Sequence, residues 1–591
     1  MTFNHYFQSE LSALREQGRR FAEHHPALAP YLAGTSTDPD VERLLEGVAF
    51  LTGRLRQKLD DELPELTHSL MHLLWPNCMR PMPALAMLQF EPLQRPLKAL
   101  PIARGTGVES RPADGIRCRF RTTSAVTLLP VELAGCRYQS HATGARLTLT
   151  LQMTCEGSLT DLDLRRLRLH LNGNAYSSRQ LYLHLCRHLD AITLQPLDAA
   201  GQPLTQQPSL TLPADHLQPC GFATEETLLP DTDQGFSGYR HLQDYFAFAE
   251  KFLFVELSGL EREVTPDKPL MQQARGLRIE FDLHHPDCRQ LTPDTDMVKL
   301  YCTPVVNLFS HDASPVRLDG RQDRYLLRPA GLAPAQCGVF SVDRVTGWKP
   351  GGMGYRTYVP FESFEHDHTL AGPDASPHYS LRQLPALDGE HLETHLCFGL
   401  QQQDQQETLS IELTCTNQQW PGKLAQGDIC HPCEGTPEFV QFRNIGRITP
   451  SYAPALHRQG LWQLISSMAL NYQTLENISA LREALSCHDL PRHCDQNAAR
   501  VSERRLNALR SVRHRQTDRL FRGLPIRGVQ SELEIDAEGC NGSGELFLFG
   551  SVLNEFFAQH AGINTFHALS IISLQGERYQ WVPRLGHQPL F

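Results

Sequence analysis

The chain has 591 residues, room for about four domains of ordinary size, and 41% of its residues are hydrophobic while 20% are charged. This balance is typical of a globular protein with buried cores and excludes an intrinsically disordered chain. The formal net charge of −11 argues against nucleic-acid binding in general, because that function needs a broad positive surface.

Residues 1–80 are predicted to form a helical region. The apolar face of the opening helix repeats at gaps of three and four residues and is lined by Phe3, Phe7, Leu11 and Leu14, with Tyr6 beside it. A second helix is predicted to start at Asp38-Pro39-Asp40, and its apolar stripe consists of Val41, Leu44, Leu45, Val48, Leu51, Leu55 and Leu59. Pro64 is predicted to open a third helix, which Pro76 ends. Such stripes pack within the chain or against a partner.

The apolar period changes to two after Pro83, and this predicts strands. The clearest alternating runs are Leu85–Phe90, Arg146–Met153, Leu277–Leu283 and Leu409–Leu413. Turns rich in Gly, Pro, Asn and Asp separate them. We therefore predict a large β-rich middle made of two sandwich- or barrel-like modules, at residues 81–290 and 291–440.

Helical patterns return after residue 441, at Leu461–Leu485 and Val501–Val512. A strand is predicted at Glu532–Ile535, followed by a Gly-rich turn. The segment Glu545–Ala561 is predicted to be a second strand that runs into an apolar helix. These elements predict an α/β C-terminal domain at residues 441–591, and the chain as a whole is predicted to have an α+β fold.

A local excess of positive charge lies between Arg500 and Arg527, where nine arginines face two acids, Glu503 and Asp518. The local net charge is therefore 9 − 2 = +7. A solvated helix face followed by a loop would account for this pattern, and so would a surface for an acidic partner.

The start of the chain has no basic segment followed by an apolar one, so we expect no export signal. No apolar run approaches the roughly 18 residues that a membrane helix needs, so we expect no direct membrane insertion. The 16 cysteines are then expected to be mostly buried thiols in a reducing, cytoplasmic setting.

A search for catalytic motifs finds neither a phosphate-binding GxxxxGK[ST] loop nor a GxSxG nucleophile elbow, and Gly542–Gly544 is predicted to be a turn. His391, Glu393 and His395 share one face of a predicted strand and could bind a metal, although an exposed polar face is favoured. Cys430 and Cys433 have the CxxC spacing of zinc ligands, but only Cys415 or Cys397 could complete a site through the fold. We therefore predict no catalytic residue, no cofactor and no metal, with Cys430 and Cys433 as the nearest metal candidates. A pair of catalytic carboxylates would leave no spacing signature.

The block Asp38–Phe90, and the segment FNHYFQSELSALREQGRRFAEHHP before it, resemble the N-terminal signature and the opening helix of one known family, the TssF family of type VI secretion baseplates. Further family-like segments follow in the expected order: LQDYFAFAEKFLFVEL, VVNLF, LTCTN, LWQLISSMALNYQTL and ELFLFGSVLNEFFAQHAGINTFHAL. The resemblance extends over nearly the whole chain.

The resemblance implies a structural role in assembly, without catalytic residues. TssF-like proteins form the wedge of the baseplate, with two TssF copies and one TssG copy per wedge, beside TssK and TssE. The wedges surround a VgrG spike, nucleate the Hcp tube and the TssB/TssC sheath, and dock at the inner-membrane complex. Related wedge proteins occur in contractile phage tails.

An assembly role makes three surfaces candidates for partner contacts. The candidate residues are Phe3, Tyr6, Phe7, Leu11 and Leu14 of the opening helix, the basic residues Arg504, Arg505 and Arg510, and Leu553, Phe556 and Phe557 of the C-terminal helix. Two alternatives stay open. One is a cytoplasmic metal-dependent or carbohydrate-active enzyme with β-sandwich modules, and the other is a baseplate protein of a phage tail.

Overall fold

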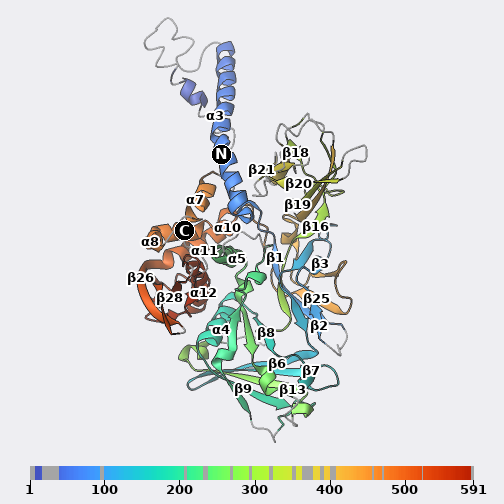
Figure 1. Ribbon diagram of the computed structural model, residues 1–591, viewed down its shortest axis with the longest axis vertical. Helices are drawn as coiled ribbons and strands as arrows, with labels where there is room; N and C mark the ends of the chain where they lie inside the picture. The colour runs from blue at the N-terminus through green and yellow to red at the C-terminus, as the bar shows by residue number, and fades with distance from the viewer. Residues whose placement is uncertain are drawn as a thin grey trace. The chain divides into compact units, whose positions relative to one another are not determined.

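The structure is a computed structural model, and it divides the chain into two compact units. One unit is Met1–Leu74 with Leu456–Ile465, and the other is Trp75–Ala455 with Ser466–Phe591. Strands dominate the middle of the chain (Figure 1), and the predicted α+β class is confirmed. The residues described are 7–8, 10–15, 17, 39–93, 99–204, 209–230, 237–265, 271–291, 296–318, 322, 324–348, 355–361, 377–386, 392–398, 407–454, 458–468, 472–521, 523–562 and 564–586. None of the helices in these ranges is long and apolar enough to cross a membrane.

Helix α3 runs without a break from Pro39 to Leu74. It starts at the predicted proline, but it continues through Pro64, so the predicted third helix is wrong. A proline inside a helix removes one backbone hydrogen bond, whereas a new helix start and stop would leave several N–H and C=O groups to be capped. Beyond α3, the short 3-10 helix η2 (Pro76–Met79) begins the second unit, next to the fully buried Trp75.

A six-stranded sheet lies at the centre of the second unit, in the order β24-β3-β4-β15-β1-β25. Its strands are β1 (Leu85–Pro92), β3 (Gly107–Ser110), β4 (Arg119–Thr122), β15 (Cys302–Val306), β24 (Ile429–Pro432) and β25 (Val440–Asn444). The predicted strand at Leu85–Phe90 is thus confirmed as β1. Because β1 pairs with both β15 and β25, this sheet joins segments far apart in the chain, and residue 290 does not separate one sheet from another.

Two more sheets are built from strands between residues 131 and 299, so one of their strands lies beyond the first predicted β-rich module. The five-stranded one has the order β10-β9-β13-β7-β6 and the four-stranded one has the order β11-β12-β8-β14. Their strands are β6 (Val131–His141), β7 (Gly144–Met153), β8 (Arg166–Leu171), β9 (Leu189–Leu197), β10 (Leu210–Pro213), β11 (Leu217–Cys220), β12 (Phe254–Ser258), β13 (Gly276–Leu283) and β14 (Val298–Lys299). Strands β7 and β13 are the predicted strands at 146–153 and 277–283, and they pair with each other so that Leu147 faces Phe281. A two-stranded sheet joins β2 (Leu100–Ile102) to β5 (Val126–Leu128).

An eight-stranded sheet with its own core takes its strands from residues 309–416. Its strands are β16 (Phe309–Asp312), β17 (Val316–Leu318), β18 (Arg324–Leu326), β19 (Gly338–Trp348), β20 (Tyr355–Pro360), β21 (His378–Pro385), β22 (Leu392–Cys397) and β23 (Glu407–Thr416). The alternation predicted at Leu409–Leu413 is confirmed, because Leu409, Ile411 and Leu413 of β23 are all buried in this core.

The C-terminal region begins with helices and ends in a mixed sheet. Its helices are α7 (Arg458–Met468), α8 (Tyr472–Leu475), α9 (Ile478–Ser486), α10 (Leu490–Cys494), α11 (Gln496–Ala508) and α12 (Ser543–Ala558). Its strands are β26 (Leu509–Phe521), β27 (Leu524–Ile535), β28 (Phe566–Ser573), β29 (Arg578–Gln580) and β30 (Arg584–Leu585). The helix predicted to reach Val512 ends earlier, because β26 starts at Leu509 and pairs with β27 in a long antiparallel hairpin.

Helix α12 corrects the prediction of a strand within Glu545–Ala561. The whole segment Ser543–Ala558 is one helix, and Gly542 is its N-cap, not part of a separate turn. Almost all of its side chains are buried, because it packs against α4 (Ala175–Arg187), α5 (Ser237–Phe248) and β28 (Figure 1). A helix covered on every side has no polar face, so its sequence shows no helical period and resembles a buried strand.

Candidate assembly surfaces and a polar cluster

The apolar residues predicted as a contact surface on the C-terminal helix lie inside the chain. Leu553, Phe556 and Phe557 are fully buried. The Phe556 ring packs edge-on against Tyr239 of α5, 5.4 Å away, and Phe557 stacks with His567 of β28 at 5.6 Å. These three side chains therefore form core between elements of one chain and do not present a surface to a partner.

The basic segment divides into one largely buried arginine and several exposed ones. The Arg505 side chain of α11 is 13% exposed, and its guanidinium lies 3.1 Å from the carboxylate of Glu545 on α12. Arg179 of α4 forms an ion pair with the same carboxylate, and Tyr245 of α5 donates a hydrogen bond to it. The Glu545 carboxylate therefore connects four helices, and Arg505 supplies the contact from α11. The prediction that Arg505 contacts a partner does not fit this position.

Arg504 and Arg510 lie at the surface, as a partner contact would require. Arg504 donates to the backbone carbonyl of Glu538 (3.0 Å), and Arg510 forms an exposed ion pair with Asp536 (3.3 Å). Among the described residues, Arg513, Arg515 and Arg519 are exposed on β26 and Arg527 lies on β27, and none of them is in the predicted loop. The positive charge thus follows an exposed strand.

The first unit contains the remaining predicted contact residues. Phe3 and Tyr6 lie outside the described residues, whereas Phe7 and Leu14 are half-buried and Leu11 is buried. On α3, however, Leu44, Val48 and Leu51 are 69%, 44% and 62% exposed. These three residues are four and three positions apart, so they form one apolar stripe on one helix face. We call this face the α3 stripe, and its sequence pattern was visible although it was not among the predicted contact residues.

Among the described residues, none of the predicted metal candidates belongs to a group of three or more possible ligands. Cys430 lies in β24 and Cys433 directly after it, whereas Cys415 is buried in β23 and Cys397 lies in β22, both in the eight-stranded sheet. Glu393 and His395 approach to 3.5 Å on β22, but His391 is outside the described residues. All 16 cysteines are free thiols, and every one except Cys494 is wholly or partly buried.

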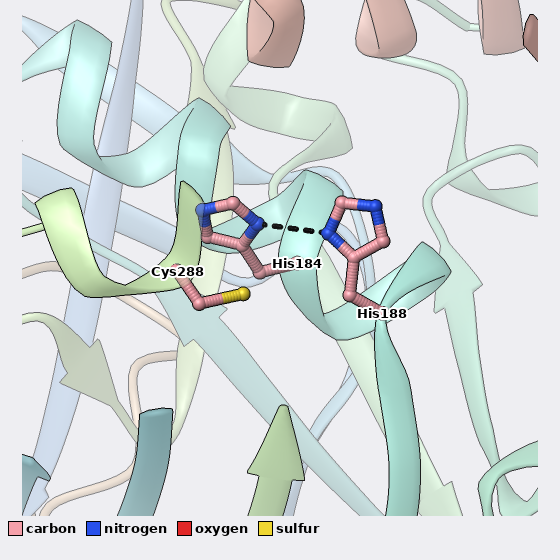
Figure 2. Close-up of side chains that lie close together, drawn as sticks. All are labelled: His184, His188 and Cys288. Carbon is pink, nitrogen blue, oxygen red and sulfur yellow. Dashed lines mark hydrogen bonds between the residues drawn. The ribbon is translucent and has the colours of Figure 1, made fainter. Parts of the chain in front are cut away.

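A different cluster, not predicted from the sequence, contains three side chains of the metal-ligand type. His184 of α4, His188 at the end of the same helix and Cys288 of η8 (Pro286–Gln290) offer ligand atoms within 4.8 Å of one another. Figure 2 shows the two imidazole rings facing each other through their Nδ1 atoms, 3.2 Å apart, with the Cys288 sulfur nearby. The available signal was a pair of histidines four positions apart, in a region that was predicted to be rich in strands and that forms helix α4 instead.

Burial controls the protonation of this cluster. It lowers the pKa of His184 to about 3 and that of His188 to about 4. It also raises the pKa of the Cys288 thiol to about 11, and the charge of Asp287 adds to that rise. Both imidazoles are therefore neutral and the thiol is protonated at neutral pH in the protein without a ligand.

Comparisons with known proteins agree over the whole chain. The family described as "Type VI secretion system, TssF" matches residues 1–588. The type VI secretion system component TssF1 of Pseudomonas aeruginosa is 28% identical, over 99% of this chain and 98% of the relative. A chain of the TssK-TssF-TssG baseplate subcomplex, determined by cryo-electron microscopy, is 32% identical with a TM-score of 0.77, over 93% of this chain and 99% of that one. A chain of the baseplate complex from the type VI secretion system is 28% identical with a TM-score of 0.63, over 100% of both chains. The chain therefore belongs to the TssF family of the type VI secretion system.

Proposed function

We propose that this chain is a non-catalytic subunit of a type VI secretion baseplate and that it works by binding partner chains. The observation that carries the proposal is the end-to-end similarity to chains solved within baseplate assemblies. A likeness that covered a single domain would allow other functions, but here the similarity spans both units of the chain. TssG and TssK, which are present in the subcomplex of the related protein, are the first partners to expect.

The wider assembly is part of the same proposal. Two copies of this chain would join one TssG in a wedge, with TssK and TssE beside them. Wedges around a VgrG spike would then start the tube and sheath, on the cytoplasmic side of the inner-membrane complex. A protein with this role needs large contact surfaces and no nucleophile, which agrees with the absence of a catalytic motif in the sequence.

The α3 stripe is our candidate for the contact with TssG. Leu44, Val48 and Leu51 form a continuous apolar row, and burying each such side chain contributes about 1.5–3 kcal/mol. Large exposed apolar rows are uncommon on chains that work alone. A helix from the partner, laid along this row, would remove it from water. Two copies of this chain that share one TssG cannot both have the same neighbours. The α3 stripe of each copy can therefore be buried against a different surface.

The test is co-purification of this chain with the TssG and TssK proteins from the same source, with the mass measured by light scattering. The double variant Leu44→Asp/Leu51→Asp should lose TssG, because two carboxylates cannot be buried in an apolar contact. Arg43→Asp is the matched control, since it adds the same two units of negative charge at an exposed position of α3 outside the stripe. This control should assemble like the unchanged chain.

Each outcome has a separate meaning. If the unchanged chain stays alone in the presence of both partners, the assembly function is wrong. If the double variant assembles as well as the control does, the function stands but the α3 stripe is not the TssG contact. Circular dichroism of the variants shows whether the strand-rich second unit is still folded.

A further inference from the structure

We propose that His184, His188 and Cys288 form a binding site for a divalent transition-metal ion, with zinc as the best match, which fastens helix α4 to the η8 turn. The ligand set of two imidazoles and one thiolate favours zinc, cobalt or a similar borderline ion over magnesium or calcium, which prefer oxygen. All of its residues lie within the second unit of this chain, whereas the α3 stripe lies in the first.

The distances fit a tetrahedral ion. Zinc binds histidine nitrogen at about 2.0–2.1 Å, so two imidazoles on one tetrahedral ion have nitrogens about 3.3 Å apart. The two Nδ1 atoms are 3.2 Å apart. A zinc-bound sulfur would lie about 3.6 Å from each nitrogen, and the separations within the cluster do not exceed 4.8 Å. A small rotation of the Cys288 side chain therefore completes the geometry.

The backbone holds the three ligands in place before any ion binds. His184 and His188 are one helical turn apart, so their side chains lie on the same face of α4. The backbone N–H of His284 donates to the carbonyl of His188 (2.9 Å), which ties the segment before η8 to the end of α4. The Tyr138 hydroxyl donates to the carbonyl of Cys288 (2.8 Å) and fixes the turn from the side of β6.

Neighbouring groups supply the outer shell that metal ligands need. The ring of His285 stacks on His188 with centroids 4.0 Å apart and planes 12° apart, so it restricts the rotation of that ligand. A carboxylate oxygen of Asp287 lies 3.6 Å from His285 Nδ1. A divalent ion with one thiolate keeps a single positive charge, and the Asp287 carboxylate can offset it.

There is also room for a fourth ligand. A cavity of about 210 Å³ is lined by both histidines and by Asp287, Gln290 and Glu577. A water molecule from this cavity, or Asp287 itself, can take the open position of a four-coordinate ion.

The remaining explanation of the cluster is a simple hydrogen bond between two imidazoles, which would show no metal preference.

The experiment uses the full chain, treated with a chelator and then supplied with zinc or cobalt(II) alone. We expect one equivalent of tightly bound metal by elemental analysis, a thiolate-to-cobalt absorption band, and a rise in melting temperature with zinc. Cys288→Ser should abolish the absorption band, and His188→Ala, at the partly exposed position, should weaken binding at least tenfold. The matched control is Cys433→Ser, a partly buried cysteine of the CxxC pair, which should leave both readouts unchanged.

Two results would overturn the site. One is that the unchanged, folded chain takes up no metal and shows no shift in melting temperature. The other is that the absorption band survives Cys288→Ser but disappears in Cys433→Ser, which would place the metal at the CxxC pair. Circular dichroism of each variant confirms that a loss of binding is not a loss of fold.

Discussion

At the scale of single residues, a buried cluster of charges links the C-terminal helices. Glu545 is buried and receives the guanidinium groups of Arg179 and Arg505 and the hydroxyl of Tyr245. The Arg505 guanidinium also lies over the Tyr245 ring, 5.0 Å from its centroid. Groups of this kind stabilise a fold only while every member is present, because a lone buried charge is costly.

We therefore predict that Arg505→Ala destabilises the C-terminal region by about 3–5 kcal/mol, since it leaves the Glu545 carboxylate partly uncompensated. Urea denaturation followed by fluorescence would measure the change. Arg504→Ala is the control, because this neighbouring arginine is exposed and makes one hydrogen bond to a carbonyl, so its loss should remove about 1 kcal/mol or less. Equal effects of the two changes would contradict the assignment of Arg505 to the core.

Glu555 of α12 makes the stability depend on pH. Burial raises the pKa of Glu555 from 4.5 to about 7, although the Arg584 guanidinium, 2.6 Å from the carboxylate, opposes the rise. Between these two pH values the folded chain keeps a proton that the unfolded chain has released. The contribution of Glu555 to the free energy of unfolding is therefore fully present below pH 4.5 and is lost as the pH rises through 7.

Glu555→Gln should remove this dependence, because the amide resembles the protonated acid and does not titrate. At about pH 5 the variant and the unchanged chain should melt at similar temperatures, whereas by about pH 8 the variant should be the more stable by up to about 3 kcal/mol, since each pKa unit corresponds to about 1.36 kcal/mol. Thermal melts across this range test the prediction, and parallel curves for the two proteins would show that Glu555 is ionised in the folded state at all these pH values.

At the scale of elements, the packing of α12 depends on a glycine. A Cβ atom added at Gly544 would lie 2.6 Å from the backbone of Arg179 and Gln180 in α4. The first turn of α12 thus touches the α4 backbone directly, and no larger residue fits without moving one helix. The same contact brings Glu545 within reach of Arg179.

Gly544→Ala should consequently destabilise the C-terminal region by about 1–3 kcal/mol, although alanine is the better helix former. Thermal melting would measure the loss. Gly422→Ala is the control, because an added Cβ there meets nothing within 4 Å, and it should change the stability little. A Gly544→Ala variant that melts no lower than the control would mean that α4 and α12 can move apart freely.

Helix α12 also shows which elements could not be predicted from the sequence. Strands β7 and β13 were predicted because each has one buried and one solvated face, which gives an alternating sequence. Helix α12 has no solvated face, so the property that reveals a helix was missing from its sequence. Arg510 was assigned to a helix and Arg513, Arg515 and Arg519 to a loop, but pairing with β27 makes all four part of strand β26.

At the scale of the whole molecule, strand pairing joins distant parts of the chain. The six-stranded sheet takes strands from residues 85–122, 302–306 and 429–444. The division into 1–80, 81–290, 291–440 and 441–591 stays a prediction, while the contacts within the structure separate only α3 and its surroundings from the rest. Sequence order is a poor guide to domains when a sheet closes through long connections.

Four features follow from the amino-acid sequence alone: family membership, the α+β class, the start of α3 and the strands with one solvated face. These features depend on the local order of residues and on apolar periods of two or 3.6 residues. Which apolar and charged residues are buried depends instead on tertiary packing. The packing places Leu553, Phe556 and Phe557 in the core and turns Arg505 inward toward the buried Glu545. It leaves Leu44 and Leu51 exposed, and it brings Cys288 to His184 and His188 from a distant part of the chain. Burial and long-range proximity arise from how separate elements pack, and no local pattern of residues records that packing.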